Sequence, residues 1–181
     1  NDVPTSMKTE DPAGWIKGTD IIAYLRYIYI LSPENNQIYK YERMSNRYST
    51  PAEYNVNGDL SGALDMTIDG NIYIVKGGGE IVKLLRGEVR PFTIRYAPED
   101  VLKDITRIYK NLDGNIYFLD PVHARVIVVA EGGTSGESTY IKQYVFEGEQ
   151  MGELQDLYVD PDESRLYVLD EKRIYKVDLT R

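Results

Sequence analysis

The fold of this chain is decided by a four-residue phrase that occurs four times: Ile28-Tyr29-Ile30-Leu31, Ile72-Tyr73-Ile74-Val75, Ile116-Tyr117-Phe118-Leu119 and Leu166-Tyr167-Val168-Leu169. Each copy reads aliphatic, tyrosine, apolar, aliphatic, and the successive tyrosines lie 44, 44 and 50 residues apart. A run that is apolar at nearly every position is typical of a strand covered on both faces. A fixed period of about 40–45 residues predicts repeated units of four strands each.

Turn residues divide each repeat into strands. Asp69-Gly70 and Asp113-Gly114 stand just before the apolar phrase, and they favour a tight hairpin because Asp and Gly tolerate positive φ. The last repeat ends after three strands. The expected strands are 20–24, 27–31, 37–41, 53–56, 64–68, 71–75, 80–84, 91–96, 105–110, 115–120, 125–129, 140–146, 154–160, 165–170 and 173–179.

These strands predict an all-β fold, a β-propeller built of four-stranded antiparallel blades. The four blades are expected at 20–57, 58–100, 101–150 and 151–181. Residues 1–19 form either a linker or a segment that closes the ring, in which case 13–18 would add the missing outer strand to the last blade and Trp15 would anchor it. The alternative is that these are the last four blades of a longer propeller, which a first residue other than Met favours.

The repeat resembles the NHL/SMP-30/TolB-like group of β-propellers, which usually have six blades. The resemblance rests on the phrase Asp-x-x-x-Asp-Gly-Asn-Ile-Tyr at 65–73 and its variant at 105–120, and it extends over 20–181. It implies blade architecture and no single activity, since such folds carry many functions. The repeat sequences are also similar to propeller segments of membrane-anchored signalling proteins. We therefore expect an extracellular or cell-envelope location rather than a cytoplasmic one.

Composition narrows the classes of partner. The formal net charge is −8 and the sequence pI is about 4.8, which argues against nucleic acid and anionic membrane surfaces because both require clustered Lys and Arg. No apolar run is long enough for a membrane helix, so we expect no membrane insertion of this segment. The chain has no cysteine, which excludes disulfides, thiolate metal sites and cysteine nucleophiles.

One candidate site lies on the propeller axis. Aligning the innermost strands places Asp20, Asp65, Arg107 and Asp156 at one equivalent position. Three carboxylates and a guanidinium around an axis suit a polar ligand or a cation such as calcium, because hard cations take oxygen ligands. The structural alternative, which we favour, is that each aspartate accepts hydrogen bonds from the backbone of the neighbouring blade.

A second candidate is a recognition surface of tyrosines, since tyrosine is favoured at protein interfaces. The alternative for these side chains is packing between outer strands. His123 is the single histidine and is expected on an exposed loop, where it cannot form a histidine-rich metal site. The candidate tyrosines are Tyr48, Tyr54, Tyr96, Tyr140 and Tyr144.

Three functions fit these observations. We favour a non-enzymatic binding or scaffold module that presents loops and blade rims to a protein or a small ligand. The first alternative is a metal-dependent hydrolase of the SMP-30/lactonase type, although the Glu-Asn-Asn-Asp metal ligands that this resemblance implies have no matching set here. The second alternative is a structural subunit of an extracellular or surface assembly. We expect no required cofactor, and the partner would be a protein or the remaining blades of a longer chain.

Overall fold

The computed structural model describes residues 17–148 and 151–179, which form four β-sheets. The first sheet is β1 (Asp20–Tyr24), β2 (Tyr27–Ser32), β3 (Gln37–Glu42) and β4 (Ala52–Glu53), and the second is β5 (Ala63–Ile68), β6 (Ile72–Lys76), β7 (Ile81–Leu85) and β8 (Glu88–Arg90). The third is β10 (Arg107–Lys110), β11 (Ile116–Asp120), β12 (Arg125–Ala130), β13 (Glu137–Val145) and β9 (Thr93–Arg95). The fourth is β14 (Asp156–Val159), β15 (Arg165–Leu169) and β16 (Ile174–Asp178).

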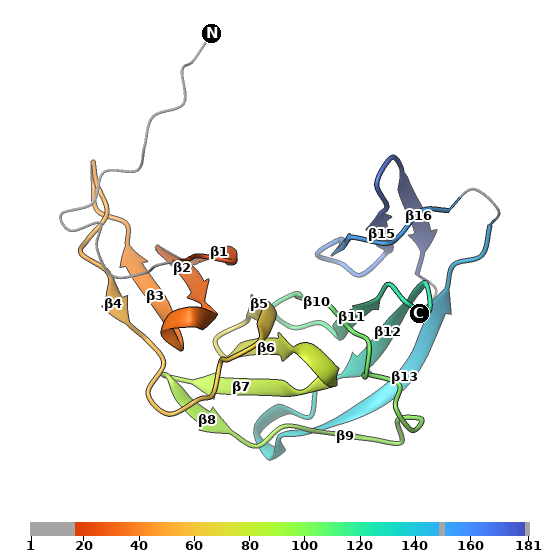
Figure 1. Ribbon diagram of the computed structural model, residues 1–181, viewed down its shortest axis with the longest axis horizontal. Coiled ribbons are helices and arrows are strands. Elements are labelled where there is room, and N and C mark those ends of the chain that lie inside the picture. Colours follow the sequence, from red (N-terminus) through yellow and green to blue (C-terminus); the bar gives the residue numbers. More distant parts are fainter. Residues whose placement is uncertain (1–16, 149–150, 180–181) are drawn as a thin grey trace, which may run out of the picture.

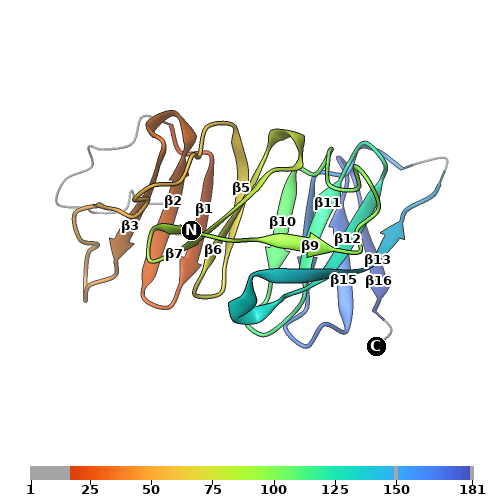
Figure 2. The same cartoon turned by 90° about the horizontal axis from the view of Figure 1, so that it is seen from below.

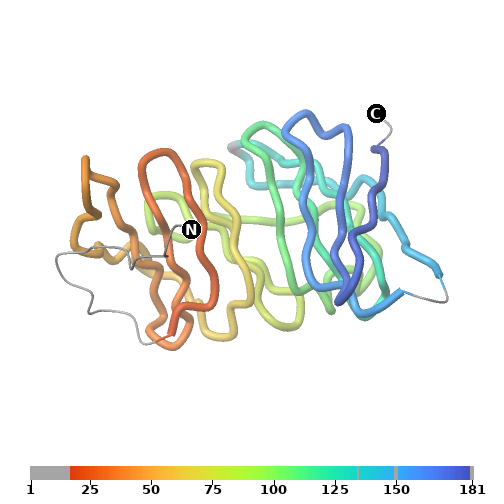
Figure 3. Tube along the Cα trace, turned by 90° about the horizontal axis from the view of Figure 1, so that it is seen from above, coloured from red at the N-terminus to blue at the C-terminus, as the bar shows by residue number. Residues whose placement is uncertain are grey.

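The sheets follow one another around an arc, with the first and last sheets at its two ends (Figure 1). The innermost strands contact each other in chain order, β1 with β5, β5 with β10 and β10 with β14. The trace keeps the same order when the molecule is viewed from above (Figure 3). This is a four-bladed β-propeller arrangement, which confirms the predicted fold class. Three short 3-10 helices, η1 (Pro33–Asn35), η2 (Gly77–Gly79) and η3 (Gly133–Ser135), lie in hairpin loops.

The four repeated tyrosines occupy equivalent second strands, as predicted. Tyr29, Tyr73 and Tyr117 on β2, β6 and β11 are 5%, 0% and 2% exposed, whereas Tyr167 on β15 is only half-buried. Each of the first three packs into an apolar cluster shared with the next sheet. In the second and third sheets the repeated phrase is therefore buried throughout, because its two faces contact two different neighbouring sheets.

One predicted strand belongs to another sheet. We expected 91–96 to be the outer strand of the second blade, but that place is taken by β8, and β9 pairs in parallel with β13 of the third sheet. Figure 2 shows β9 crossing from the second sheet to the third. Pro91 has no N–H for a sheet ladder, and Phe92 and Ile94 pack in the apolar cluster between the two sheets, where the Phe92 ring lies 5.7 Å from the Tyr73 ring.

The fourth sheet has three strands among the described residues, as the sequence predicts. The expected closing strand at 13–18 lies outside the described residues except for Lys17 and Gly18. These two precede β1, and the Lys17 ammonium lies 3.2 Å from the Glu34 carboxylate of the first sheet. Their neighbour Thr19 donates its backbone N–H to Leu31, which continues the β1–β2 ladder by one residue.

Candidate binding sites

The four axial candidates occupy equivalent ladder positions. Asp20, Asp65, Arg107 and Asp156 pair with Leu31, Val75, Leu119 and Leu169, the last residue of the apolar phrase in each sheet. Asp20, Asp65 and Asp156 border a cavity of about 600 Å³ that is lined by the innermost strands of all four sheets, and the Arg107 guanidinium lies near enough to the Asp65 carboxyl to lower its pKa. The topology thus brings together the residues that the sequence alignment selected.

Two of the three carboxylates hold the next sheet in place. Asp20 Oδ2 accepts the Met66 backbone N–H of the second sheet at 3.1 Å, and Asp65 Oδ2 accepts the Ile108 N–H of the third sheet at 2.7 Å. Asp156 instead accepts the N–H of its own neighbour, Leu157. The backbone role that we favoured for the aspartates is therefore present at two positions.

Asp65 has the most perturbed acidity on the axis. Burial, and after it the nearby Asp20 carboxylate, raise the pKa of its carboxyl from the ordinary 3.8 to about 8. Within residues 17–148 and 151–179, no three His, Cys, Asp or Glu side chains form a group that could hold a metal ion. A ligand or calcium at the axis stays a prediction.

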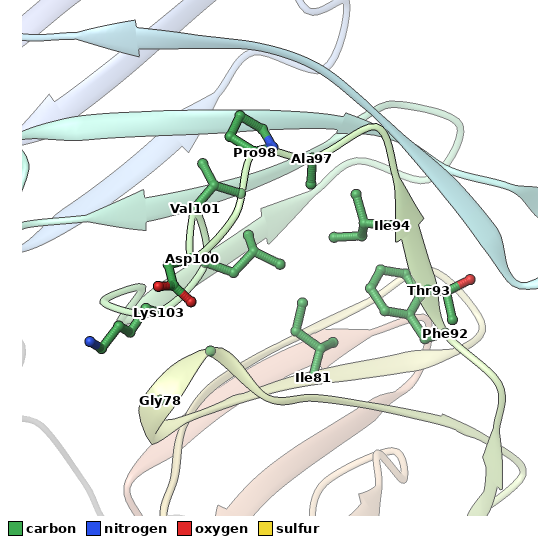
Figure 4. A pocket seen from close by; sticks show the side chains of 12 residues that line it. Gly78, Ile81, Phe92, Thr93, Ile94, Ala97, Pro98, Asp100, Val101 and Lys103 are labelled. Atoms are coloured by element: carbon green, nitrogen blue, oxygen red, sulfur yellow. The ribbon is translucent and has the colours of Figure 1, made fainter.

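A second hollow lies at the rim between the second and third sheets. It has a volume of about 500 Å³ and lies between the loop before β7, the strand β9 and the loop 97–103 (Figure 4). The side chains of Ile81, Phe92 and Ile94 point toward one another across it (Figure 4). We call it the rim pocket, and its lining includes Ile81, Phe92, Ile94, Ala97, Val101 and Leu102, together with the charged Asp100 and Lys103.

The backbone around the rim pocket needs unusual dihedral angles. Gly79 has a φ of +85°, and a Cβ built there would lie 2.3 Å from the Leu102 carbonyl oxygen, so only glycine lets the two segments meet. Tyr96, directly before Ala97, has a φ of 60° and is 81% exposed. A bulky residue rarely adopts this conformation, and such positions cluster at functional sites.

The candidate tyrosines do not form one surface. Tyr48 packs on the outer cluster of the first sheet, Tyr54 on the cluster between the first two sheets, and Tyr140 and Tyr144 on the next two clusters. Tyr96 stands apart as a side chain that is almost fully exposed. The other four contribute mainly to packing, which leaves Tyr96 as the best candidate for recognition.

His123 lies on an exposed loop and belongs to a charged cluster. Its Nδ1 lies 2.9 Å from Asp120 Oδ2 and 3.8 Å from Asp104 Oδ2, and the Arg125 guanidinium contacts the same Asp120 oxygen at 2.8 Å. Asp120 also accepts the His123 backbone N–H. The arrangement ties the β11–β12 hairpin together, and it contains no nucleophile for the histidine to activate.

The sequence reasoning missed the rim pocket. Three separate segments build it, residues 78–81, 92–94 and 97–103. The signal that existed was the run from Pro91 to Pro98, where apolar side chains alternate with prolines and polar residues. If 91–96 were the outer strand of the second blade, these side chains would lie elsewhere. The pocket therefore exists because β9 joins the third sheet.

Comparisons with known proteins support the fold. No protein-family model and no curated protein matches this chain. It is similar in structure to the computationally designed Ika4 protein, with a TM-score of 0.61 at 9% identity over 98% of this chain and 100% of that one. It is also similar to Hsv2 from Kluyvelomyces marxianus, with a TM-score of 0.57 at 10% identity over 91% and 47%. Virginiamycin B lyase from Staphylococcus aureus gives 0.53 at 14% identity over 88% and 54%.

These likenesses define the class of fold and no more. The chain is a β-propeller by its sheets and by its structural neighbours, and it spans about half the length of Hsv2 and of the lyase. The neighbours include an enzyme, so the fold alone does not decide between catalysis and binding. The narrower NHL/SMP-30/TolB resemblance stays a prediction. No helix among the described residues has the length and apolar character needed to cross a membrane.

Proposed function

We propose that this chain is a non-enzymatic binding module that takes an apolar side chain or a short apolar segment of a protein partner into the rim pocket. The observation that carries the proposal is the pocket itself. It is a hollow lined by apolar side chains together with polar groups, one residue of each charge among them, and such a mixture is usual for a recognition site. The exposed Tyr96 adds an aromatic side chain next to it in the chain.

The axial residues support the same proposal because two of them already bind the backbone of an adjacent sheet. Asp20 and Asp65 each accept a backbone N–H of the adjacent sheet, so these carboxylates already have a structural task. The single histidine is engaged with Asp120 at the surface.

A metal-dependent hydrolase of the SMP-30/lactonase type is the alternative. The observation in its favour is Asp65, whose carboxyl lies in the axial cavity with its pKa raised to about 8. A perturbed carboxyl in a cavity is a feature of active sites as well as of structural ion networks. If the alternative holds, a divalent metal should support hydrolysis of a lactone, and Asp65→Asn should abolish it.

The test of the proposal is a selection of displayed random peptides on the immobilised protein, followed by affinity measurements with a synthetic peptide from the enriched set. Ala97→Arg places a long charged side chain in the pocket and should weaken binding by about tenfold or more, equivalent to about 1.4 kcal/mol. Tyr96→Ala should weaken it too. The matched control is Ala52→Arg, on the exposed β4 far along the chain from the pocket.

Two results would contradict the proposal. One is a selection in which no peptide is enriched over the unselected library. The other is a set of enriched peptides that bind Ala97→Arg, Ala52→Arg and the unaltered protein equally well. A thermal melt of each variant shows whether it is folded, so that a loss of affinity can be assigned to the pocket.

A further inference from the structure

A lysine stands opposite the repeated tyrosine in three of the four sheets, on the neighbouring third strand. These cross-strand pairs are Tyr29 with Lys40, Tyr73 with Lys83, and Tyr167 with Lys176. In the third sheet the residue paired with Tyr117 is Val128. One copy of the repeat therefore carries an aliphatic side chain where the other three carry an ammonium group.

The second sheet shows where this ammonium group lies when the next sheet covers it. The Lys83 ammonium is 5.2 Å from the centre of the Tyr73 ring and 3.7 Å from Oε1 of Glu131, which directly follows β12 of the third sheet. The Tyr73 hydroxyl donates a hydrogen bond of 2.5 Å to the same Glu131 oxygen. In the first sheet the Lys40 ammonium lies 5.8 Å from the centre of the Tyr29 ring. An aromatic ring and a carboxylate both stabilise a cation at this place.

The interface between the third and fourth sheets has the carboxylate without that lysine. Glu163, in the hairpin between β14 and β15, accepts hydrogen bonds from the backbone and the side chain of Asn115 at 2.6 and 3.0 Å. Burial, and after it the Glu163 carboxylate, raise the pKa of the Tyr117 hydroxyl, so the carboxylate lies close to the repeated tyrosine. Val128 is 2% exposed and brings no charge to this place.

A cavity of about 400 Å³ lies at this interface. Its aliphatic walls are Val128, Ile141 and Leu179, and its charged lining residues are Lys142, Asp162 and Glu163. Two carboxylates and one ammonium leave the lining with an excess of one negative charge, which favours a further cation. Both sheets that form the cavity are described, so it is a space between two blades and not an open end of the propeller.

Tyr144 lines the same cavity, and its hydroxyl is buried without a hydrogen-bond partner among the described residues. A buried hydroxyl in this state is unfavourable, and its oxygen can accept a hydrogen bond. After burial and Glu163, Tyr144 is a further group that raises the pKa of Tyr117, so the two hydroxyls lie near each other. The Lys142 ammonium lies over the ring of Tyr144, 5.0 Å from its centre.

We propose that this cavity binds a small primary amine, a molecule with one ammonium group on an apolar body. The ammonium group takes the place of the repeat's lysine at the Tyr117 ring, and it donates hydrogen bonds to the Glu163 carboxylate and the Tyr144 hydroxyl oxygen. The apolar body packs against the aliphatic walls. We call the cavity the amine site. It is separate from the rim pocket, which lies between the second and third sheets, so the inference does not depend on the proposed function.

The test is a titration of the unaltered protein at pH 7, followed by the nuclear magnetic resonance shifts of its backbone amides. The probe is phenethylamine, and the matched neutral compound is 2-phenylethanol, which has the same body with a hydroxyl in place of the ammonium group. We expect phenethylamine to bind with a Kd below about 1 mM, and at least about tenfold more tightly than 2-phenylethanol.

Substitutions place the amine within the cavity. Val128→Lys supplies the repeat's own lysine and should abolish binding of phenethylamine, whereas Val122→Lys, at a 70% exposed valine of the same sheet, should leave the affinity unchanged. Tyr144→Phe should weaken binding and leave the melting temperature unchanged, because its hydroxyl has no described partner to lose. Glu163→Gln should weaken binding by about tenfold or more. Ala97→Arg should keep the affinity, which separates this result from the fate of the rim pocket.

Three results would overturn the inference. Equal binding of phenethylamine and 2-phenylethanol, or no binding of either, would show that the cavity does not select an ammonium group. Equal affinities of Val128→Lys and Val122→Lys would place the amine elsewhere. Binding that appears only in Lys142→Met or Arg181→Ala would show that a cation of the chain itself occupies the site. A thermal melt checks that each variant is folded, and Tyr144→Phe decides the matter if Val128→Lys is not.

Discussion

Tyr117 and Tyr167 are equivalent residues of the third and fourth sheets. Truncating each of them separates what the next sheet contributes to the free energy of unfolding from what the tyrosine's own sheet contributes. Tyr117 is 2% exposed and packs among Leu119, Val128 and apolar residues of the fourth sheet. Tyr117→Ala removes the ring from this cluster and leaves a cavity, which costs about 3–5 kcal/mol for a large aromatic side chain. Tyr167 holds the equivalent position but is half-buried, with no described sheet beyond it. Tyr167→Ala should cost about 1 kcal/mol.

The assay is urea unfolding followed by far-ultraviolet circular dichroism, with each free energy extrapolated to water. Stacked sheets can unfold in parts. The comparison therefore holds only if the unfolding free energy of each variant depends on urea concentration with the same slope as that of the unaltered protein. A loss below about 1 kcal/mol for Tyr117→Ala would show that the interface between the third and fourth sheets does not stabilise the chain as argued. Equal losses for the two variants would refute the distinction between an interior and a terminal sheet.

Four further outcomes follow from particular contacts. The free energy of unfolding should fall as pH rises from about 4 to about 8, because the raised pKa of Asp65 makes its charged form unfavourable in the folded state, and Asp65→Asn should remove that slope in a pH series of melts. Tyr73→Phe should cost about 1.5–3 kcal/mol by urea unfolding, since it removes a hydrogen bond to the charged Glu131. Gly79→Ala should lower the melting temperature, because its Cβ would overlap the Leu102 carbonyl at a positive φ, and an unchanged melt would mean that the loop moves freely. Millimolar calcium should leave the melting temperature unchanged, whereas a rise of several degrees that Asp65→Asn abolishes would support the hydrolase.

The blade pattern could be predicted from the sequence because it depends on local rules. In the second and third repeats the apolar phrase is buried on both faces, and the Asp-Gly turns fix where the hairpin begins. The axial position followed from the same period, since equivalent strands of a repeat protein face the same axis. These features needed only the register of each hairpin, which short turns determine.

The rim pocket could not be predicted because it depends on which sheet a three-residue strand joins. Thr93, Ile94 and Arg95 show an exposed, half-buried, exposed pattern that either sheet would accept. The choice is made by contacts distant in sequence, including the packing of Phe92 on Tyr73 and the pairing of Arg95 with Glu137. Four of the five candidate tyrosines, Tyr48, Tyr54, Tyr140 and Tyr144, pack against apolar clusters, and this packing also depends on neighbouring chain segments that the sequence pattern alone does not place.

The most direct test of the central proposal is a fluorescence-anisotropy titration of one selected peptide against three proteins, the unaltered chain, Ala97→Arg and Asp65→Asn. A binding module that uses the rim pocket predicts an affinity lost by about tenfold or more in Ala97→Arg and kept within about twofold in Asp65→Asn. The opposite pattern, with binding kept in Ala97→Arg and lost in Asp65→Asn, would contradict the account and move the functional site to the axis.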